Sequence, residues 1–369
     1  MGSGQTVDGR GYRAGIGAGA CFLLTGFVFA SFASRVPAIK DELGISDGEL
    51  ALAFVGLNAG AIIGLQLGGM LVTRTGSRPA LTASLVGFAG ALSALGWVPN
   101  LPALVGALFV LAAVNSVADV AMNAQGVTVQ RLLGHPVLSG MHAMHSLGGL
   151  LGAGAGTLAA RVVAAPQGHF LVVGVVAAVG CLAVSPLLLP SPADAEDESS
   201  GATLGAVAGM SEWLRGWSLP VAVLGALAFC FTLAEGAALD WSAVYVNDSL
   251  GGSAALGAAA LGVFLGAVTL GRLAGDRLVS RFGAARVFWV GAVVAGMGFG
   301  SALIVATLPA GLVGLGFLGA GIANALPLAI SAGGNAPGEA PATAAARVST
   351  LAYLGSFVGP ALIGSLATL

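Results

Sequence analysis

The sequence predicts an all-α polytopic membrane protein, and three observations carry that prediction. Of its 369 residues, 57% are apolar and only 8% are charged, whereas about 25% of the residues in an ordinary soluble domain are charged. Apolar runs of about 20 residues, the length a spanning helix needs, recur along the whole chain. In addition, one constant offset, the 207 residues between Asp41 and Asp248, relates three regions of the first half to three regions of the second.

Eleven of the apolar runs are predicted to be spanning helices, at residues 14–36, 50–72, 80–98, 101–126, 137–163, 170–189, 219–246, 254–276, 287–306, 310–332 and 343–366. Residues 191–217 are acidic and Ser-rich at their start, which predicts a flexible cytoplasmic linker. This linker divides an N-terminal six-helix half, residues 1–190, from a C-terminal half of five helices, residues 218–369. The repeat predicts a twelfth helix beyond Leu369, so that helix is expected to be missing and the chain to have eleven spans.

The repeat also predicts where helices pack closely. Its matched positions include both glycines and other residues, namely Asp41 with Asp248, Leu43 with Leu250, Gly44 with Gly251, Gly64 with Gly271, Gly68 with Gly275, Arg74 with Arg281, Gly76 with Gly283, Leu147 with Leu354, Gly148 with Gly355 and Gly152 with Gly359. Gly60, Gly64 and Gly68 are four residues apart on the second span. Because small residues let helix backbones approach in lipid, this row and its counterpart around Gly271 and Gly275 are predicted to be packing seams.

The distribution of arginine and lysine predicts the orientation. If the N-terminus is inside, nine arginines fall on the cytoplasmic side, namely Arg10, Arg13, Arg74, Arg78, Arg131, Arg215, Arg277, Arg281 and Arg286. The opposite side then holds only Arg35, Lys40 and Arg161. Since cytoplasmic loops carry the excess of basic residues, we expect a cytoplasmic N-terminus in a bacterial inner membrane.

The loop after the second span of each half carries a resemblance to a known family. The two copies read GMLVTRTGSR at residues 69–78 and DRLVSRFGAAR at residues 276–286. Two halves in parallel repeat with such basic turns resemble the major facilitator superfamily, whose signature loop reads roughly G-x-x-x-D-R-x-G-R-R. Thr73 and Ser280 replace its usual Asp, although Asp276 and Arg277 lie one turn earlier. The resemblance implies the major facilitator fold, two pseudo-symmetric six-helix halves that alternate access to a central site.

Three further segments are similar to a bacterial branch of that superfamily near fucose permease. They read SFASRVPAIKDELGIS, MNAQGVTVQRLLGHPVLSGMHAMHSLGG and AEGAALDWSAVYV. The resemblance implies a proton-coupled symporter that imports a small polar, sugar-like solute. The fourth span has no Arg and the fifth has no Gly-Pro pair, both usual in drug-exporter branches, which favours import. Two alternatives stay open: a proton-coupled exporter of drugs or metabolites, and a non-transporting membrane sensor or scaffold.

Polar residues of the fourth and fifth spans form the first candidate site. Asn115, Asp119 and Asn123 are four residues apart and share a helix face. With the fourth span ending near residue 126, Asp119 lies about 10 Å from its cytoplasmic end, near the depth of His142 and His145. Since ionisable groups in spans are rare, Asp119, His142 and His145 are predicted to couple protons, with Asn115 and Asn123 contacting substrate. Alternatively, Asp119 is a structural acid capped by Asn115 or a histidine, and the histidines are interfacial.

The seventh span carries the second candidate site. Glu235 is expected to bind a proton or substrate, or else to form a structural ion pair, and Trp241 to stack on a sugar ring or anchor the interface. Arg35 lies at a depth similar to that of Asp240, so the two are predicted to form an outer gate, unless Arg35 extends to the headgroups. The uncharged hydrogen-bonding residues of the last spans add Asn324 and Tyr353 as substrate contacts.

The sequence lacks the motifs of ATP-driven pumps, of hydrolytic and metal-dependent enzymes and of nucleic-acid-binding proteins. No GxxxxGK[ST] loop, HExxH motif or Ser/His dyad is present, and His142-x-x-His145 alone is a weak metal motif. No Arg-rich stripe with interleaved aromatics suggests nucleic-acid binding. We therefore expect no enzyme activity, cofactor, metal or nucleic-acid partner, and a monomer whose partners are a small-molecule substrate, protons and the lipid bilayer.

Overall fold

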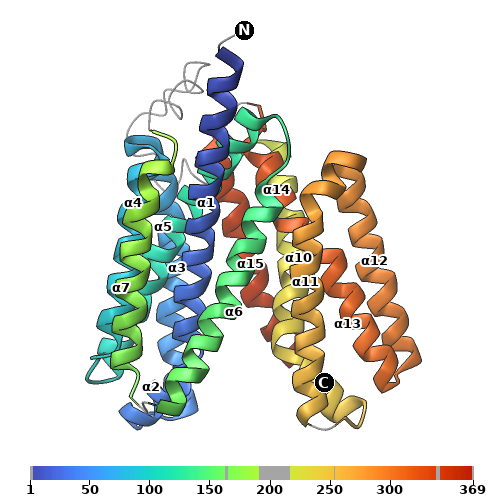
Figure 1. The fold of residues 1–369 in the computed structure, drawn as a ribbon. Coiled ribbons are helices and arrows are strands. Elements are labelled where there is room, and N and C mark those ends of the chain that lie inside the picture. The colour runs from blue at the N-terminus through green and yellow to red at the C-terminus, as the bar shows by residue number, and fades with distance from the viewer. Residues whose placement is uncertain (1–2, 163–164, 191–216, 253, 338–340, 368–369) are drawn as a thin grey trace. The chain divides into compact units, whose positions relative to one another are not determined.

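The computed structural model describes residues 3–162, 165–190, 217–252, 254–337 and 341–367, and these residues form helices joined by short turns, with no strand among them (Figure 1). They form two compact units. The first comprises residues 1–137, 144–203 and 338–346, and the second comprises residues 138–143, 204–337 and 347–369. The predicted linker, residues 191–217, lies outside the described residues except for Trp217.

The helices of the first part of the chain are α1 (Ser3–Ala33), α2 (Val36–Leu43), α3 (Asp47–Thr75), α4 (Ser77–Leu95), α5 (Leu101–Leu133), α6 (Leu138–Val162), α7 (Gln167–Val184) and the 3-10 turn η1 (Ser185–Leu187). Those of the second part are α10 (Leu219–Val244), the π-helical turn η3 (Tyr245–Ser249), α11 (Ala254–Phe282), α12 (Ala284–Val305), α13 (Leu308–Ile322), α14 (Ala325–Gly334) and α15 (Pro341–Ala367). In the described part of the chain, nine helical segments are long and apolar enough to cross a bilayer. The all-α membrane fold is thus confirmed, while the count of eleven spans stays a prediction.

Several helix boundaries follow directly from local chemistry. Ser46 caps α3 and forms a reciprocal capping box with Glu49, whose carboxylate accepts the Ser46 N–H at 2.8 Å. Asn100 caps α5 by accepting the Ala103 N–H at 3.0 Å. At its other end, α5 stops at Gly134, which adopts φ 67°.

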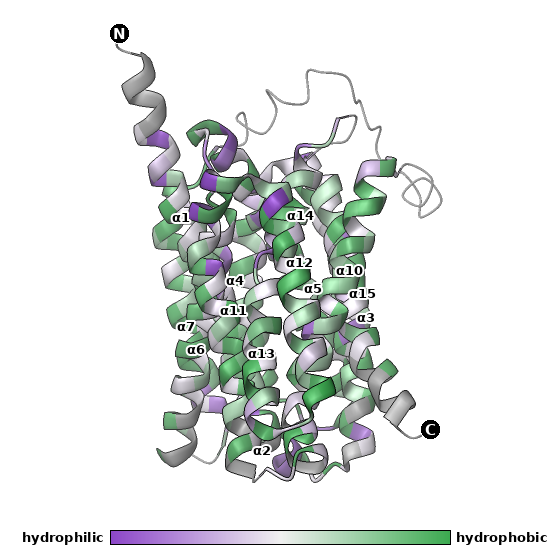
Figure 2. Cartoon of the chain, turned by 90° about the vertical axis from the view of Figure 1, so that its right-hand side faces the viewer, coloured by the Kyte–Doolittle hydropathy of each residue, from purple (hydrophilic) through white to green (hydrophobic). Residues whose placement is uncertain are grey.

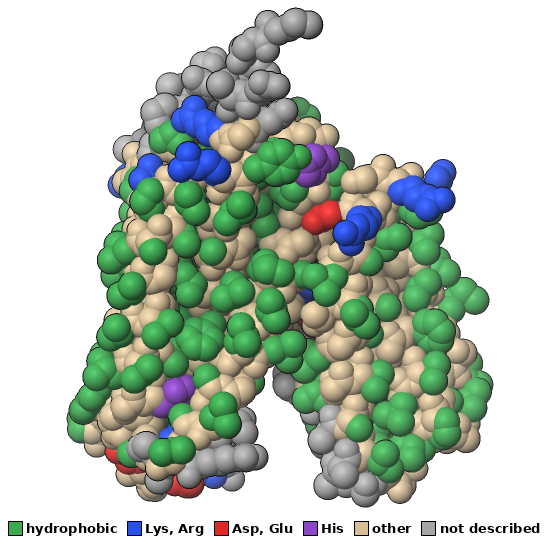
Figure 3. Space-filling view, viewed as in Figure 1, with side chains coloured by type: hydrophobic (Ala, Val, Ile, Leu, Met, Phe, Trp, Pro, Cys, Tyr) green, Lys and Arg blue, Asp and Glu red, His purple; other side chains and the backbone are tan. Residues whose placement is uncertain are grey.

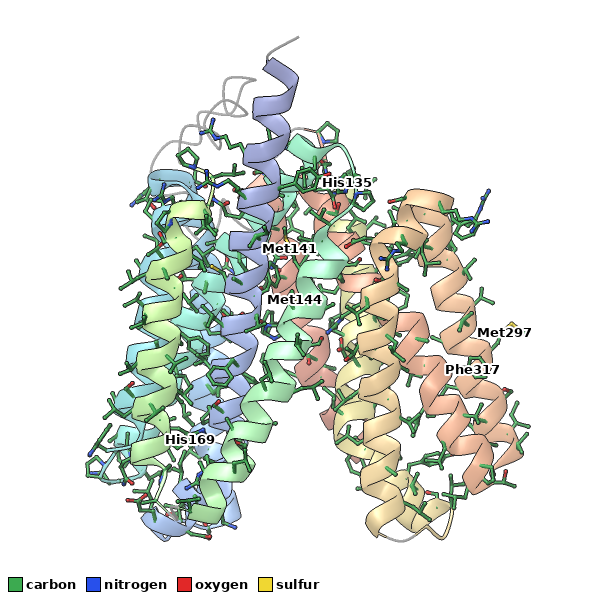
Figure 4. All side chains as sticks on the ribbon, in the orientation of Figure 1. His135, Met141, Met144, His169, Met297 and Phe317 are labelled. Atoms are coloured by element: carbon green, nitrogen blue, oxygen red, sulfur yellow. The ribbon has the colours of Figure 1, made fainter. Side chains whose placement is uncertain are left out.

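Most helices show hydrophobic colouring along their length (Figure 2). Large apolar side chains also project outward in Figure 4, where Met297 of α12 is 71% exposed and Phe317 of α13 is 48% exposed. Exposed apolar side chains in such number suit a helix surface that faces lipid rather than water.

The 207-residue repeat is confirmed in the backbone. Gly44 and Gly251 both have positive φ, 62° and 67°, and Gly76 and Gly283 do as well, 85° and 82°. Only glycine adopts such conformations without strain. The two parts of the chain therefore share turns of the same geometry at the same places.

The predicted packing seams are also confirmed within each unit. A β-carbon at Gly60 or Gly64 of α3 would overlap a backbone carbonyl oxygen of α5, and one at Gly68 would press on Val120. In the second unit, one at Gly271 of α11 would press on Ala323. Small residues at these positions thus let the helices approach closely.

A buried glutamine joins three segments at one end of the first unit by hydrogen bonds. Gln125 of α5 is fully buried, and its Nε2 donates to Ser77 Oγ at 2.7 Å and to the Leu189 carbonyl at 3.1 Å. Its Oε1 accepts the Leu189 N–H at 3.1 Å. One side chain therefore joins α5, the start of α4 and the segment after η1.

Gln125→Leu should destabilise this unit by about 2–4 kcal/mol, because it leaves the N–H and carbonyl of Leu189 buried without partners. Denaturant unfolding of the purified protein in detergent would measure the change. Ser84→Ala is the matched control, since within the described residues the Ser84 hydroxyl bonds carbonyls of its own helix alone, at 2.7 and 3.2 Å. Equal losses in the two variants would contradict the role assigned to Gln125.

Candidate functional site

An ion pair links two candidate spans of the second unit. Nη2 of Arg272 on α11 lies 3.2 Å from Oε1 of Glu235 on α10. The Arg272 side chain is 13% exposed and that of Glu235 is 24% exposed. Charged residues within a span are costly and mark functional sites by default. Glu235, predicted from the sequence, therefore sits in an ion pair whose arginine was not predicted.

The Glu235–Arg272 pair is hydrogen-bonded to a helix that is interrupted between α13 and α14. The sequence predicted one continuous span at residues 310–332, but the structure breaks it between α13 and α14, at Ala323 and Asn324. Pro327 explains the break, since it has no N–H for the carbonyl four residues earlier, which is that of Ala323. Nε of Arg272 donates to this freed carbonyl at 3.2 Å. The helix break and the ion pair thus form one assembly.

Asn324 extends the same assembly. Its Nδ2 donates to the Gly271 carbonyl at 2.9 Å, so it binds the residue next to Arg272. Asn324 is 6% exposed, and among the described residues its Oδ1 has no hydrogen-bond partner. A buried acceptor without a donor costs free energy, so this atom is suited to accept a hydrogen bond from a ligand or water.

The acid of the first unit is linked to an asparagine on its own helix. Nδ2 of Asn123 donates to Asp119 Oδ1 at 3.2 Å and to the Asp119 carbonyl at 2.9 Å. Asn123 is fully buried and Asp119 is partly buried. The shared face predicted for these two residues is therefore present, and Asn115 lies one turn before them, half-buried.

The end predicted for the fourth span is wrong. The fourth span does not end near residue 126, because α5 continues to Leu133. Asp119 lies 14 residues before that end, or about 21 Å, whereas His145 lies seven residues after the start of α6 at Leu138, or about 10 Å. The two side chains are thus at different levels of adjoining helices.

The two histidines predicted to couple protons, His142 and His145, both lie on α6. Nδ1 of His145 lies 3.2 Å from Oγ1 of Thr25 on α1, and that hydroxyl donates to the Phe22 carbonyl at 2.8 Å. Because the Thr25 hydroxyl donates its proton to the Phe22 carbonyl, Nδ1 of His145 must be the donor in its hydrogen bond with Thr25. His142 is 7% exposed and belongs to the second unit, whereas Asp119 belongs to the first. A pairing of Asp119 with a histidine stays a prediction.

The predicted gate residues are only partly described. Arg35 lies at the turn between α1 and α2 and is 2% exposed, so it is buried rather than extended into solvent. The side chain of Asp240 lies outside the described residues. His169 of α7, labelled in Figure 4, interacts electrostatically with Arg35, and both of its ring nitrogens lack a hydrogen-bond partner in the described chain. His169 was not among the residues predicted from the sequence.

The remaining predicted substrate contacts are half-buried aromatic residues. Trp241 lies near the end of α10. Tyr353 lies on α15, where its ring is 6.4 Å from that of Phe357. Both present polar and apolar surface, as residues that contact sugars do.

A further carboxylate of the second unit caps a helix. Asp276 of α11 accepts the Ser139 N–H with Oδ1 at 3.1 Å and the Gly140 N–H with Oδ2 at 2.7 Å, at the start of α6. A carboxylate at a helix N-terminus is favourable because it meets unpaired N–H groups and the positive end of the helix dipole. This carboxylate, one turn before the usual position of the Asp in the loop motif, therefore joins α11 to the start of α6.

Comparisons with known proteins agree with this architecture. The family model described as Major Facilitator Superfamily matches residues 18–360. An MFS-type transporter of Yersinia pestis, described as uncharacterized, is 31% identical over 94% of this chain and 87% of its own. In fold, the chain is similar to the MFS transporter FucP in the outward conformation, with TM-score 0.80, 17% identity and coverage of 95% and 91%. It is also similar to the proton:xylose symporter XylE bound to 6-bromo-6-deoxy-D-glucose, with TM-score 0.73, 16% identity and coverage of 97% and 89%.

Proposed function

This chain belongs to the Major Facilitator Superfamily of transporters, and we propose that it is a secondary active transporter that imports a small polar, sugar-like solute with protons by alternating access. The observation that carries the proposal is the Glu235–Arg272 pair at the α13–α14 break. Interrupted helices that expose backbone groups beside charged side chains are typical of transporter binding sites. The XylE title, which names proton:xylose symport, gives a precedent on the same fold.

The proposal assigns roles to the candidate residues. Glu235 and Asp119 take up and release protons, together with His142 and His145. The substrate is bound by the polar and aromatic side chains Asn115, Asn123, Glu235, Trp241, Asn324 and Tyr353. Arg35 and Asp240 form the outer gate. The N-terminus is cytoplasmic, in the inner membrane of a bacterium.

The proposal is tested by reconstituting the protein in vesicles. A thermal-shift screen of sugars, polyols and organic acids first identifies a stabilising solute. We expect that an inward proton gradient drives accumulation of the labelled solute and that a protonophore abolishes it. If no polar solute stabilises the protein while lipophilic cations do, or if the gradient drives only efflux, the import proposal is wrong.

Asp119→Asn should abolish this accumulation while substrate binding and solute exchange persist, because the amide keeps the hydrogen-bonding shape but carries no titratable proton. Asp41→Asn is the control, since Asp41 is an exposed carboxylate on α2. Normal accumulation by Asp119→Asn would remove Asp119 from the coupling mechanism.

A further inference from the structure

A basic pocket, separate from the candidate substrate and proton-coupling residues, lies at one end of the first unit. It has a volume of about 510 Å³ and is lined by Gly9, Arg10 and Arg13 of α1, Arg78 of α4 and the segment Pro186–Pro190 after α7. Figure 3 shows Lys and Arg side chains gathered near this end of α1. None of the described residues that line the pocket is acidic.

The three arginines of this pocket have no counter-ion in the described chain. Arg10 and Arg13 are three residues apart and so share one face of α1. No hydrogen bond or ion pair within the described residues reaches the guanidinium group of either one or that of Arg78. The three positive guanidinium groups around this pocket repel one another, and a bound anion would reduce that repulsion. Guanidinium groups bind phosphate oxygens in a bidentate fashion, so a phosphate group fits this charge.

The wall of the pocket is held in place by the hydrogen bonds of Gln125. That buried side chain fixes both backbone groups of Leu189, which lines the pocket, and the hydroxyl of Ser77, the residue before Arg78. This part of the wall is therefore held in place before a ligand binds. A preorganised wall lowers the cost of holding a ligand.

The position of the pocket along the helices identifies the source of the phosphate. Helix α1 begins at Ser3 and α4 at Ser77, so Arg10 and Arg13 lie within the first three turns of α1 and Arg78 lies in the first turn of α4. These turns are at the level of lipid headgroups when the spans cross a bilayer, where basic pockets bind anionic lipids. We propose that this pocket binds the phosphate group of an anionic phospholipid such as phosphatidylglycerol.

The test compares lipid binding by the full-length protein and two triple variants. Native mass spectrometry in detergent would measure the affinity for dioctanoyl phosphatidylglycerol, with dioctanoyl phosphatidylcholine as the zwitterionic reference. Arg10→Gln/Arg13→Gln/Arg78→Gln should weaken phosphatidylglycerol binding by about fivefold per arginine, or about 100-fold in total at low salt. Arg74→Gln/Arg277→Gln/Arg281→Gln removes three exposed arginines outside the pocket and should weaken it little.

Glycerol 3-phosphate as a competitor separates the two sources of the phosphate group. If glycerol 3-phosphate competes, the phosphate group alone is recognised. If it does not compete, the acyl chains are needed as well. Either result supports a phosphate site, provided that the pocket variant loses binding of phosphatidylglycerol. Equal binding by the wild-type protein and the pocket variant would overturn the proposal, as would an equal loss in the control variant. Size-exclusion profiles of both variants confirm folding.

Discussion

Glu235→Gln is expected to abolish solute accumulation driven by a proton gradient and to destabilise the protein by about 3 kcal/mol. The substitution removes the titratable group and leaves Arg272, 13% exposed, without its carboxylate inside a candidate span. Breaking a buried pair by removing one partner is costly because the remaining charge is uncompensated. Vesicle uptake and denaturant unfolding would measure the two effects separately.

The double variant Glu235→Gln/Arg272→Gln distinguishes coupling from folding. It removes both charges, so most of the lost stability should return, apart from the hydrogen bond of Arg272 to the Ala323 carbonyl. Proton-driven accumulation should stay absent because Glu235 is still missing. If the double variant transported normally, the pair would be only a structural brace. If the single variant transported normally, Glu235 would have no part in coupling.

The sequence predicted the features that depend on local pattern. Apolar runs predicted the helices, and the spacing of Asp119 and Asn123 predicted the face on which they hydrogen-bond. The glycine spacing of Gly60 and Gly64 predicted a close helix contact. Each of these follows from helical periodicity, which is readable without knowledge of the tertiary neighbours.

Features that depend on tertiary partners were missed or misplaced. The apolar run predicts that the fourth span ends near residue 126, before Arg131. Gln125 is instead satisfied by Ser77 and Leu189, which lie far along the chain, so the helix continues. The apolar run therefore ends before the helix does, and α5 continues until Gly134 terminates it.

The break at the α13–α14 junction is a similar case. Pro327 is visible in the sequence, but spanning helices tolerate proline when neighbours satisfy the freed backbone groups. Here Arg272 is that neighbour, 51 residues away in sequence from the carbonyl it binds. Its importance could have been suspected only from its charge within the predicted span 254–276.

Gly64→Ala should destabilise the first unit by about 3 kcal/mol, through overpacking at the contact of α3 with α5. A β-carbon at this position would overlap the carbonyl oxygen of Ala113, and backbone atoms cannot rotate away as a flexible side chain can. Loss of folded protein on size-exclusion chromatography and a lower unfolding midpoint would measure the effect. Gly60, beside the carbonyl of Phe109, should respond in the same way.

Gly106→Ala makes the identical chemical change on α5, at a position with nothing within 4 Å of the added carbon. Since alanine favours a helix over glycine by about 1 kcal/mol, this control should be neutral or stabilising. The Gly64 substitution should therefore lower the stability while the Gly106 substitution leaves it unchanged or raises it, a difference that helix propensity alone does not predict. If both substitutions stabilised the protein, α3 and α5 would have to move apart at little cost to admit the new methyl group. Close packing against the Ala113 carbonyl would then not explain the glycine at position 64.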